Sequence, residues 1–130
     1  MKLVRHLSLV ALSLLATAVS ASDFDGSKDL ICAPVSVMEC LRGEECLAGL
    51  PEDIDAPAFM RFDFKKKLVI GPKVAAEILL QDKTAERLML QGREAGFGWT
   101  IVIGARLGDM TVSLTTLNSA VVMYGSCTPN

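Results

Sequence analysis

The chain has 130 residues, 51% of them hydrophobic, and carries a formal net charge of −2. This length predicts one domain with a single hydrophobic core. The acidic balance argues against nucleic acid or an anionic membrane surface as the main partner.

Residues 1 to 21 have the organisation of a secretory signal peptide. Lys2, Arg5 and His6 make the start basic, and an apolar run from residue 7 to 19 follows. That run is shorter than the about 20 residues that span a bilayer, so an uncleaved membrane anchor is disfavoured. We expect the mature chain to start at Ser22, to have no stable membrane insertion, and to be located in the periplasm or secreted.

The only histidine of the chain, His6, lies in this signal segment. The mature chain therefore has no imidazole, which excludes Ser-His-Asp and Cys-His catalysis and histidine-ligated zinc or copper. Removing Lys2 and Arg5 from the 13 basic residues leaves 11 against 15 acidic residues, a formal net charge of −4 for the mature chain.

The cysteines of the chain predict disulfides. There are four of them, without a C-x-x-C pair: Cys32, Cys40, Cys46 and Cys127. An even count in an exported chain predicts two structural bridges, for which three pairings are possible. We favour Cys40 with Cys46, which closes a local loop, and Cys32 with Cys127, which ties the ends of the chain together.

Residues 22 to 57 are rich in proline and acidic side chains, and we predict irregular loops pinned by the disulfides. Residues 23 to 27 are interpreted as a solvated N-terminal tail. Glu39, Glu44 and Glu45 surround the loop between Cys40 and Cys46 and form an acidic patch that would attract a basic partner. The alternative interpretation is ordinary solvated charge on a loop.

A period-two pattern begins at residue 58, where apolar side chains at 58, 60, 62 and 64 predict a half-buried strand. A run of lysines from 65 to 67 then forms a turn into a second short strand, which ends at Gly71.

Residues 73 to 92 fit two structures. Ala, Glu, Leu, Gln, Met and Lys are good helix formers, and Pro72 is a suitable residue to open a helix. Two strands joined by a turn at residues 82 to 84 fit the apolar spacing equally well.

The C-terminal part of the chain predicts an antiparallel meander. Three apolar runs rich in β-branched residues are separated there by glycine-bearing turns. Trp99, the only tryptophan, stands at the head of the first run. It fits either a core side chain or the floor of a ligand cavity.

Four short motifs lie in the last part of the chain: Leu90-Gln-Gly92, Gly98-Trp99-Thr100, Gly108-Asp-Met110-Thr111 and Tyr124-Gly125-Ser126-Cys127-Thr128. With them the chain resembles a group of small exported proteobacterial proteins of unknown function. Their pattern is an L-x-G turn, then G-W-[ST], a glycine turn and a terminal aromatic-G-[SA]-C-T. The resemblance implies a β-rich domain with strands over residues 73 to 91, and it implies no activity.

The predicted fold is therefore all-β, a single small antiparallel meander closed as a barrel or folded as a sandwich. We expect about seven strands, at residues 58–64, 67–70, 74–81, 85–91, 97–103, 110–116 and 120–126. The predicted organisation is a signal peptide over 1–21, an irregular disulfide-pinned segment over 22–57 and a β-domain over 58–130.

The expected function is that of a non-catalytic exported binding or inhibitor-like domain, with a basic protein or a small apolar ligand as partner. Glu39, Glu44, Glu45 and Trp99 are the candidate contact residues. The alternative is a structural or assembly accessory factor of the cell envelope.

An enzyme is the least favoured class. Its candidate residues show no spacing that forces them together: Glu44, Glu45, Asp53, Asp55, Lys73, Ser113 and Ser126. The segment Gly96-Phe97-Gly98 lacks the spacing of a dinucleotide-binding motif, so no cofactor is predicted. No metal site is predicted either.

Overall fold

The computed structural model describes residues 22 to 130, and the expected signal peptide, residues 1 to 21, lies outside the described residues. Nine strands and one short 3-10 helix make up the described part: β1 (Leu30–Leu41), β2 (Leu47–Gly49), η1 (Pro51–Ile54), β3 (Met60–Asp63), β4 (Leu68–Ile70), β5 (Ala75–Lys83), β6 (Arg87–Glu94), β7 (Phe97–Gly104), β8 (Asp109–Thr115) and β9 (Ser119–Pro129).

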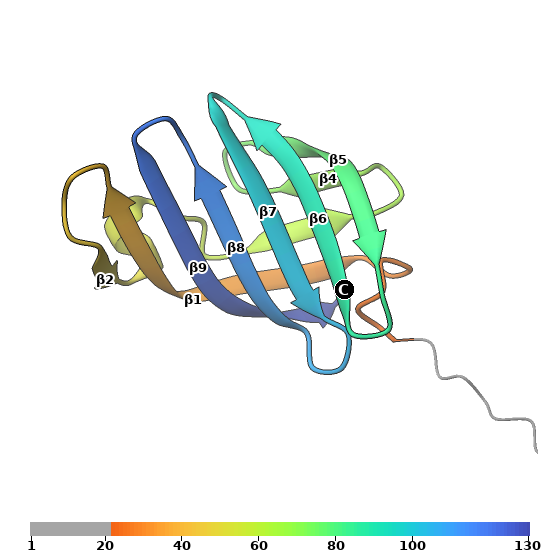
Figure 1. Ribbon diagram of the computed structural model, residues 1–130. Coiled ribbons are helices and arrows are strands. Elements are labelled where there is room, and N and C mark those ends of the chain that lie inside the picture. The colour runs from red at the N-terminus through yellow and green to blue at the C-terminus, as the bar shows by residue number, and fades with distance from the viewer. Residues whose placement is uncertain (1–21) are drawn as a thin grey trace, which may run out of the picture.

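The strands close into an antiparallel barrel (Figure 1). From β3 to β9 each strand pairs with the next one along the chain, and β1 joins the two ends of this meander. The first residues of β1 pair with β3, while almost the whole of β1 pairs with β9. Strand β2 is added to the far half of β1, from Val37 to Glu39. Eight strands thus form the barrel and β2 extends it, which decides between the barrel and the sandwich.

The all-β prediction is confirmed, and each of the seven predicted strands has a counterpart among β3 to β9. The helix alternative over residues 73 to 92 is wrong, because β5 and β6 occupy that stretch. These strands bury Ile78, Leu88 and Leu90 in the barrel, so tertiary burial outweighs the helical propensity of the segment.

The prediction that residues 22 to 57 are irregular is wrong over β1 and β2. Strand β1 directs Leu30, Cys32 and Val37 into the barrel, but a bulge between Pro34 and Ser36 shifts its register against β9. The extra residue, Val35, is 62% exposed. Because the bulge breaks the period-two pattern, the sequence does not reveal this strand. Strand β1 belongs to the barrel and not to a separate loop region.

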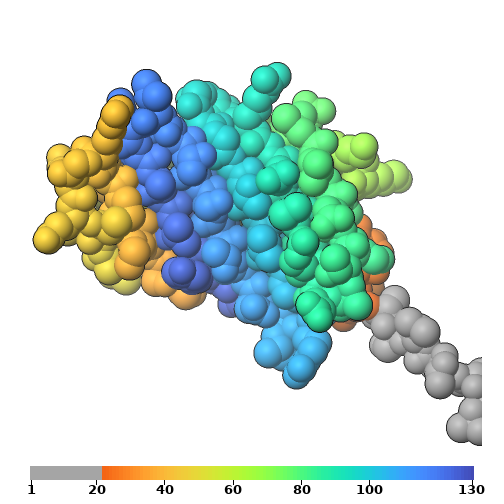
Figure 2. Space-filling view, viewed as in Figure 1, coloured from red at the N-terminus to blue at the C-terminus, as the bar shows by residue number. Residues whose placement is uncertain are grey.

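Alternate residues of the strands fill the barrel. The largest fully buried side chains are Phe62, Leu30, Leu88, Leu90, Ile103, Met110 and Val112. Burying an apolar side chain of this size contributes about 1.5 to 3 kcal/mol, so this interior is the main source of stability. Figure 2 shows strands β6 to β9 side by side, their side chains forming a continuous outer wall.

The segment from residue 22 to 29 covers one end of the barrel. Phe24 packs on the core beside Gly108, and the hydroxyl of Ser22 donates a hydrogen bond to the carbonyl oxygen of Ala105. The Asp25 carboxylate lies 3.0 Å from the ammonium of Lys83 at the end of β5. The interpretation of residues 23 to 27 as a solvated tail is therefore wrong, because they contact the β5 and β7–β8 ends of the barrel (Figure 1).

Both predicted disulfides are confirmed. Cys32 and Cys127 face each other across β1 and β9 and are bonded, over a separation of 95 residues. Cys40 and Cys46 close the loop between β1 and β2. The long bridge joins the two strands that close the barrel, so it reinforces that closure covalently.

Candidate functional site

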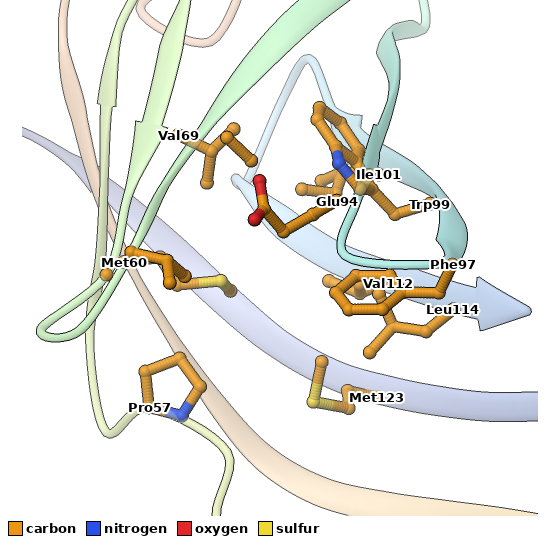
Figure 3. A pocket seen from close by; sticks show the side chains of 13 residues that line it. Pro57, Met60, Val69, Glu94, Phe97, Trp99, Ile101, Val112, Leu114 and Met123 are labelled. Atoms are coloured by element: carbon orange, nitrogen blue, oxygen red, sulfur yellow. The ribbon is translucent and has the colours of Figure 1, made fainter.

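The end of the barrel opposite the N-terminal segment contains a cavity. Its volume is about 130 Å³, it is partly open to solvent, and its lining is almost entirely apolar. The lining residues come from seven strands and the loops beside them: Pro57, Met60, Val69, Gly71, Val74, Ala76, Glu94, Phe97, Trp99, Ile101, Val112, Leu114 and Met123. Figure 3 shows the lining side chains around the hollow and labels ten of them.

Trp99 forms part of the cavity wall and is 6% exposed. It pairs with Gly92 across β6 and β7, and its indole lies over that glycine. A Cβ atom at Gly92 would lie within 3.0 Å of the indole ring and 2.5 Å from the carbonyl oxygen of Glu77. A residue without a side chain is therefore required opposite Trp99, which gives a structural reason for the two motifs Leu90-Gln-Gly92 and Gly98-Trp99-Thr100.

The indole nitrogen of Trp99 is buried and has no hydrogen-bond partner among residues 22 to 130. Buried donors are nearly always paired, and leaving one unpaired costs about 1 to 3 kcal/mol. Trp99 therefore carries a buried polar group whose hydrogen-bonding capacity is not used by the described residues.

Glu94 is the ionisable residue among those that line the cavity. It ends β6 opposite Phe97, and the turn between them has only two residues, Ala95 and Gly96, with φ of 40° and 90°. Two central residues with positive φ define a type I′ hairpin turn, which keeps the strand pairing regular up to Glu94. Side chains alternate along β6, so Glu94 shares the inward face with Leu88 and Leu90, and Figure 3 shows its carboxylate directed into the hollow.

Trp99 is thus in the place that both interpretations predict, since it packs in the core and also lines a cavity. Glu44 and Glu45 are exposed on the disulfide-closed loop. Glu39 differs from them, because it is half-buried in β1 on the same face as Val37, which points into the barrel. The acidic patch on the loop surface therefore consists of Glu44 and Glu45, with Glu39 turned to the inner side of the sheet.

The residues considered for catalysis have structural partners or lie apart. Lys73 donates to the Asp55 carboxylate at 2.7 Å, and Asp53 accepts a hydrogen bond from the backbone of Leu50 at the start of η1. Ser113 and Ser126 alternate with inward-facing residues of β8 and β9 and so lie on the outer face. In residues 22 to 130, no three His, Cys, Asp or Glu side chains gather as a metal site requires.

The sequence-based interpretation misses Glu94 as a site residue. The sequence does contain the pattern that reveals Glu94: every second residue from Leu88, through Leu90 and Gly92 to Glu94, lies on the buried face of β6. It is hidden because the five residues between the predicted strands look like an ordinary loop, whereas only Ala95 and Gly96 form the turn.

No helix within residues 22 to 130 has the length and apolar character needed to cross a membrane. Comparison with protein-family models, with curated proteins and with solved structures gives no match. The site is therefore interpreted from its own geometry.

Proposed function

We propose that this protein is a non-catalytic exported binding domain that takes a small, mainly apolar ligand into the cavity beside Trp99. The observation that carries the proposal is the partly open apolar cavity of about 130 Å³ at one end of a closed barrel. The mouths of β-barrels are common ligand sites, and a cavity of roughly 150 Å³ with an aliphatic lining can hold benzene. A short alkyl chain or a single ring therefore matches the space.

The two disulfides support the exported location that is part of this proposal. Both disulfides are formed among the described residues, and bridges of this kind persist in the periplasm and in secreted proteins. Together with the signal peptide expected over residues 1 to 21, they favour a role in the periplasm or outside the cell.

The only tryptophan lies in the cavity wall, so its fluorescence can report binding directly. We expect hexanol to change the Trp99 emission of the exported, oxidised protein in a saturable way. Ala76→Leu places three additional carbons in the cavity, and it should weaken hexanol binding at least about fivefold by removing buried contact area.

Ala75→Leu is the matched control, because Ala75 is the neighbouring residue of β5 and is exposed on the outer face. It makes the same chemical change without filling the cavity, and it should leave hexanol binding unchanged. A titration without saturation, or equal binding by the two variants, would contradict the proposal.

A basic protein is the second candidate partner. Glu44 and Glu45 lie on a loop that the Cys40–Cys46 bridge closes, and Leu41 and Leu47 beside it are 44% and 69% exposed. Acidic charge next to exposed apolar side chains suits a partner with basic and apolar groups. Capture of one periplasmic protein by the wild type, lost in Glu44→Lys/Glu45→Lys and retained in Ala76→Leu, would favour this function over the cavity.

A further inference from the structure

We infer that the ligand of this cavity carries a positively charged amine at one end of its apolar body, with Glu94 as the recognition residue. The inference rests on the proposed function, since it specifies the class of ligand that the cavity accepts. Three observations support it: the position of Glu94, the lack of a partner for its carboxylate, and the aromatic ring of Trp99 in the same lining.

The position of Glu94 is unusual for a barrel of this size. Inward positions of small barrels are normally filled by apolar side chains, and the other lining side chains of this cavity are apolar or aromatic. A carboxylate placed against apolar groups loses hydration, which is unfavourable unless a cation or hydrogen-bond donor compensates. Glu94 is half-buried and its carboxylate enters the hollow (Figure 3).

No partner for this carboxylate comes from the chain itself. The five ion pairs within residues 22 to 130 join lysine or arginine to aspartate, and none of them, nor any side-chain hydrogen bond there, includes Glu94. The adjacent cation, Arg93, is exposed, and strand alternation places it on the outer face. The negative charge at the cavity is therefore not neutralised by a residue of the described chain.

Trp99 suits a cationic ligand group through its ring, because the face of an indole attracts cations. This side chain lines the cavity together with Glu94. An ammonium group beside Glu94 and a short apolar body therefore match the charge and the apolar lining of the cavity.

The test compares three probes of equal length with different charge: hexylamine, hexanol and hexanoate. Each is titrated into the exported, oxidised protein at pH 7 and constant ionic strength, with Trp99 emission as the readout. We expect hexylamine to bind about tenfold more tightly than hexanol, because hydrogen bonds to a charged group contribute more than neutral ones. Hexanoate should bind most weakly.

Glu94→Gln keeps the shape of the side chain and removes its charge. It should make the Kd values of hexylamine and hexanol equal within about twofold, and saturable binding of hexanol by the variant shows that its cavity is intact. Glu77→Gln makes the same change at an exposed carboxylate of β5, and it should retain the preference for the amine.

Equal affinities of the three probes for the wild type would overturn the inference while leaving the apolar cavity established as a binding site. An amine preference that survives in Glu94→Gln would also overturn it. Failure of all three probes to bind would contradict the proposed function as well.

Discussion

At the scale of single residues, Gly92 and Trp99 are closely matched in shape. The indole fills the space that a side chain at position 92 would need, and the glycine leaves that space free. The shape of the cavity wall therefore depends on a residue that does not itself appear in the lining.

We expect Gly92→Ala to destabilise the protein by about 1 to 3 kcal/mol, because the new methyl group overlaps the indole and a backbone oxygen. Urea unfolding followed by Trp99 emission measures the effect. Gly98→Ala is the control, since the nearest atom to its Cβ would be the hydroxyl oxygen of Thr115 at 3.8 Å. A loss of similar size in both variants would show that the cost arises from glycine replacement in a strand and not from Trp99.

A second effect at the residue scale concerns Asp25. Hydrogen bonds from Ser27 and then from Lys83 lower the pKa of this carboxyl from 3.8 to about 2. Because the pKa is lower in the folded protein than in the unfolded chain, Asp25 stabilises the fold above pH 4, and this contribution disappears as the pH falls from about 4 to about 2.

Asp25→Asn should therefore remove about 1 to 2 kcal/mol of stability at pH 7 and much less near pH 2, a figure reduced for partial solvent screening. Thermal unfolding of the wild type and the variant at both pH values measures the difference. Asp23→Asn, at a neighbouring carboxylate that is 52% exposed, serves as the control. A constant difference across the pH range would exclude the ionised carboxylate as its cause.

At the scale of elements, the β6–β7 hairpin is the feature that brings Glu94 and Phe97 to the cavity. Its type I′ turn needs positive φ at both central positions, which glycine and asparagine adopt more readily than alanine. Ala95 therefore occupies a position that is unfavourable for its side chain.

Ala95→Asn should stabilise the protein by about 0.5 to 1 kcal/mol, because asparagine tolerates the left-handed conformation. Ala95→Val should have the opposite sign, since a β-branched residue fits this conformation poorly. Chemical unfolding at one temperature compares the three proteins. Equal stability of the asparagine and valine variants would show that the turn adopts another conformation in solution.

The elements also show what can be predicted from the sequence. Strands β3, β4, β7, β8 and β9 are predictable, because apolar alternation and glycine turns act locally, whereas the pattern over β5 and β6 fits a helix equally well. The positions of β1 and Glu94 are not predictable, because one depends on a bulge at Val35 and the other on a turn of only two residues. The bulge reverses which side chains of β1 face inward. Glu94 continues the alternation of β6, but it lies beyond the predicted end of that strand because the turn is shorter than expected.

At the scale of the whole molecule, we expect the two disulfides to contribute different amounts to the free energy of unfolding. The Cys32–Cys127 bridge spans 95 residues and the Cys40–Cys46 bridge spans 6. In the chain-entropy account, the long loop contributes roughly 4 to 5 kcal/mol and the short loop roughly 2 kcal/mol.

Replacing Cys32 and Cys127 together by serine should therefore lower the free energy of unfolding about twice as much as replacing Cys40 and Cys46. Urea unfolding of the two double variants beside the oxidised wild type makes the comparison, with each variant serving as the control for the other. A larger loss from the short bridge would show that it has a structural role beyond loop closure.

The pairing of β1 with β9 also sets the order in which the parts of the barrel form during folding. Strand β1 forms its longest pairing with β9, so this edge of β1 stays open until β9 becomes available. During synthesis the chain can form its local hairpins early, but the barrel and the cavity within it are completed only when β9 pairs with β1. An open strand edge is prone to pairing with other chains, so the newly made protein is most vulnerable to aggregation just before its last residues arrive.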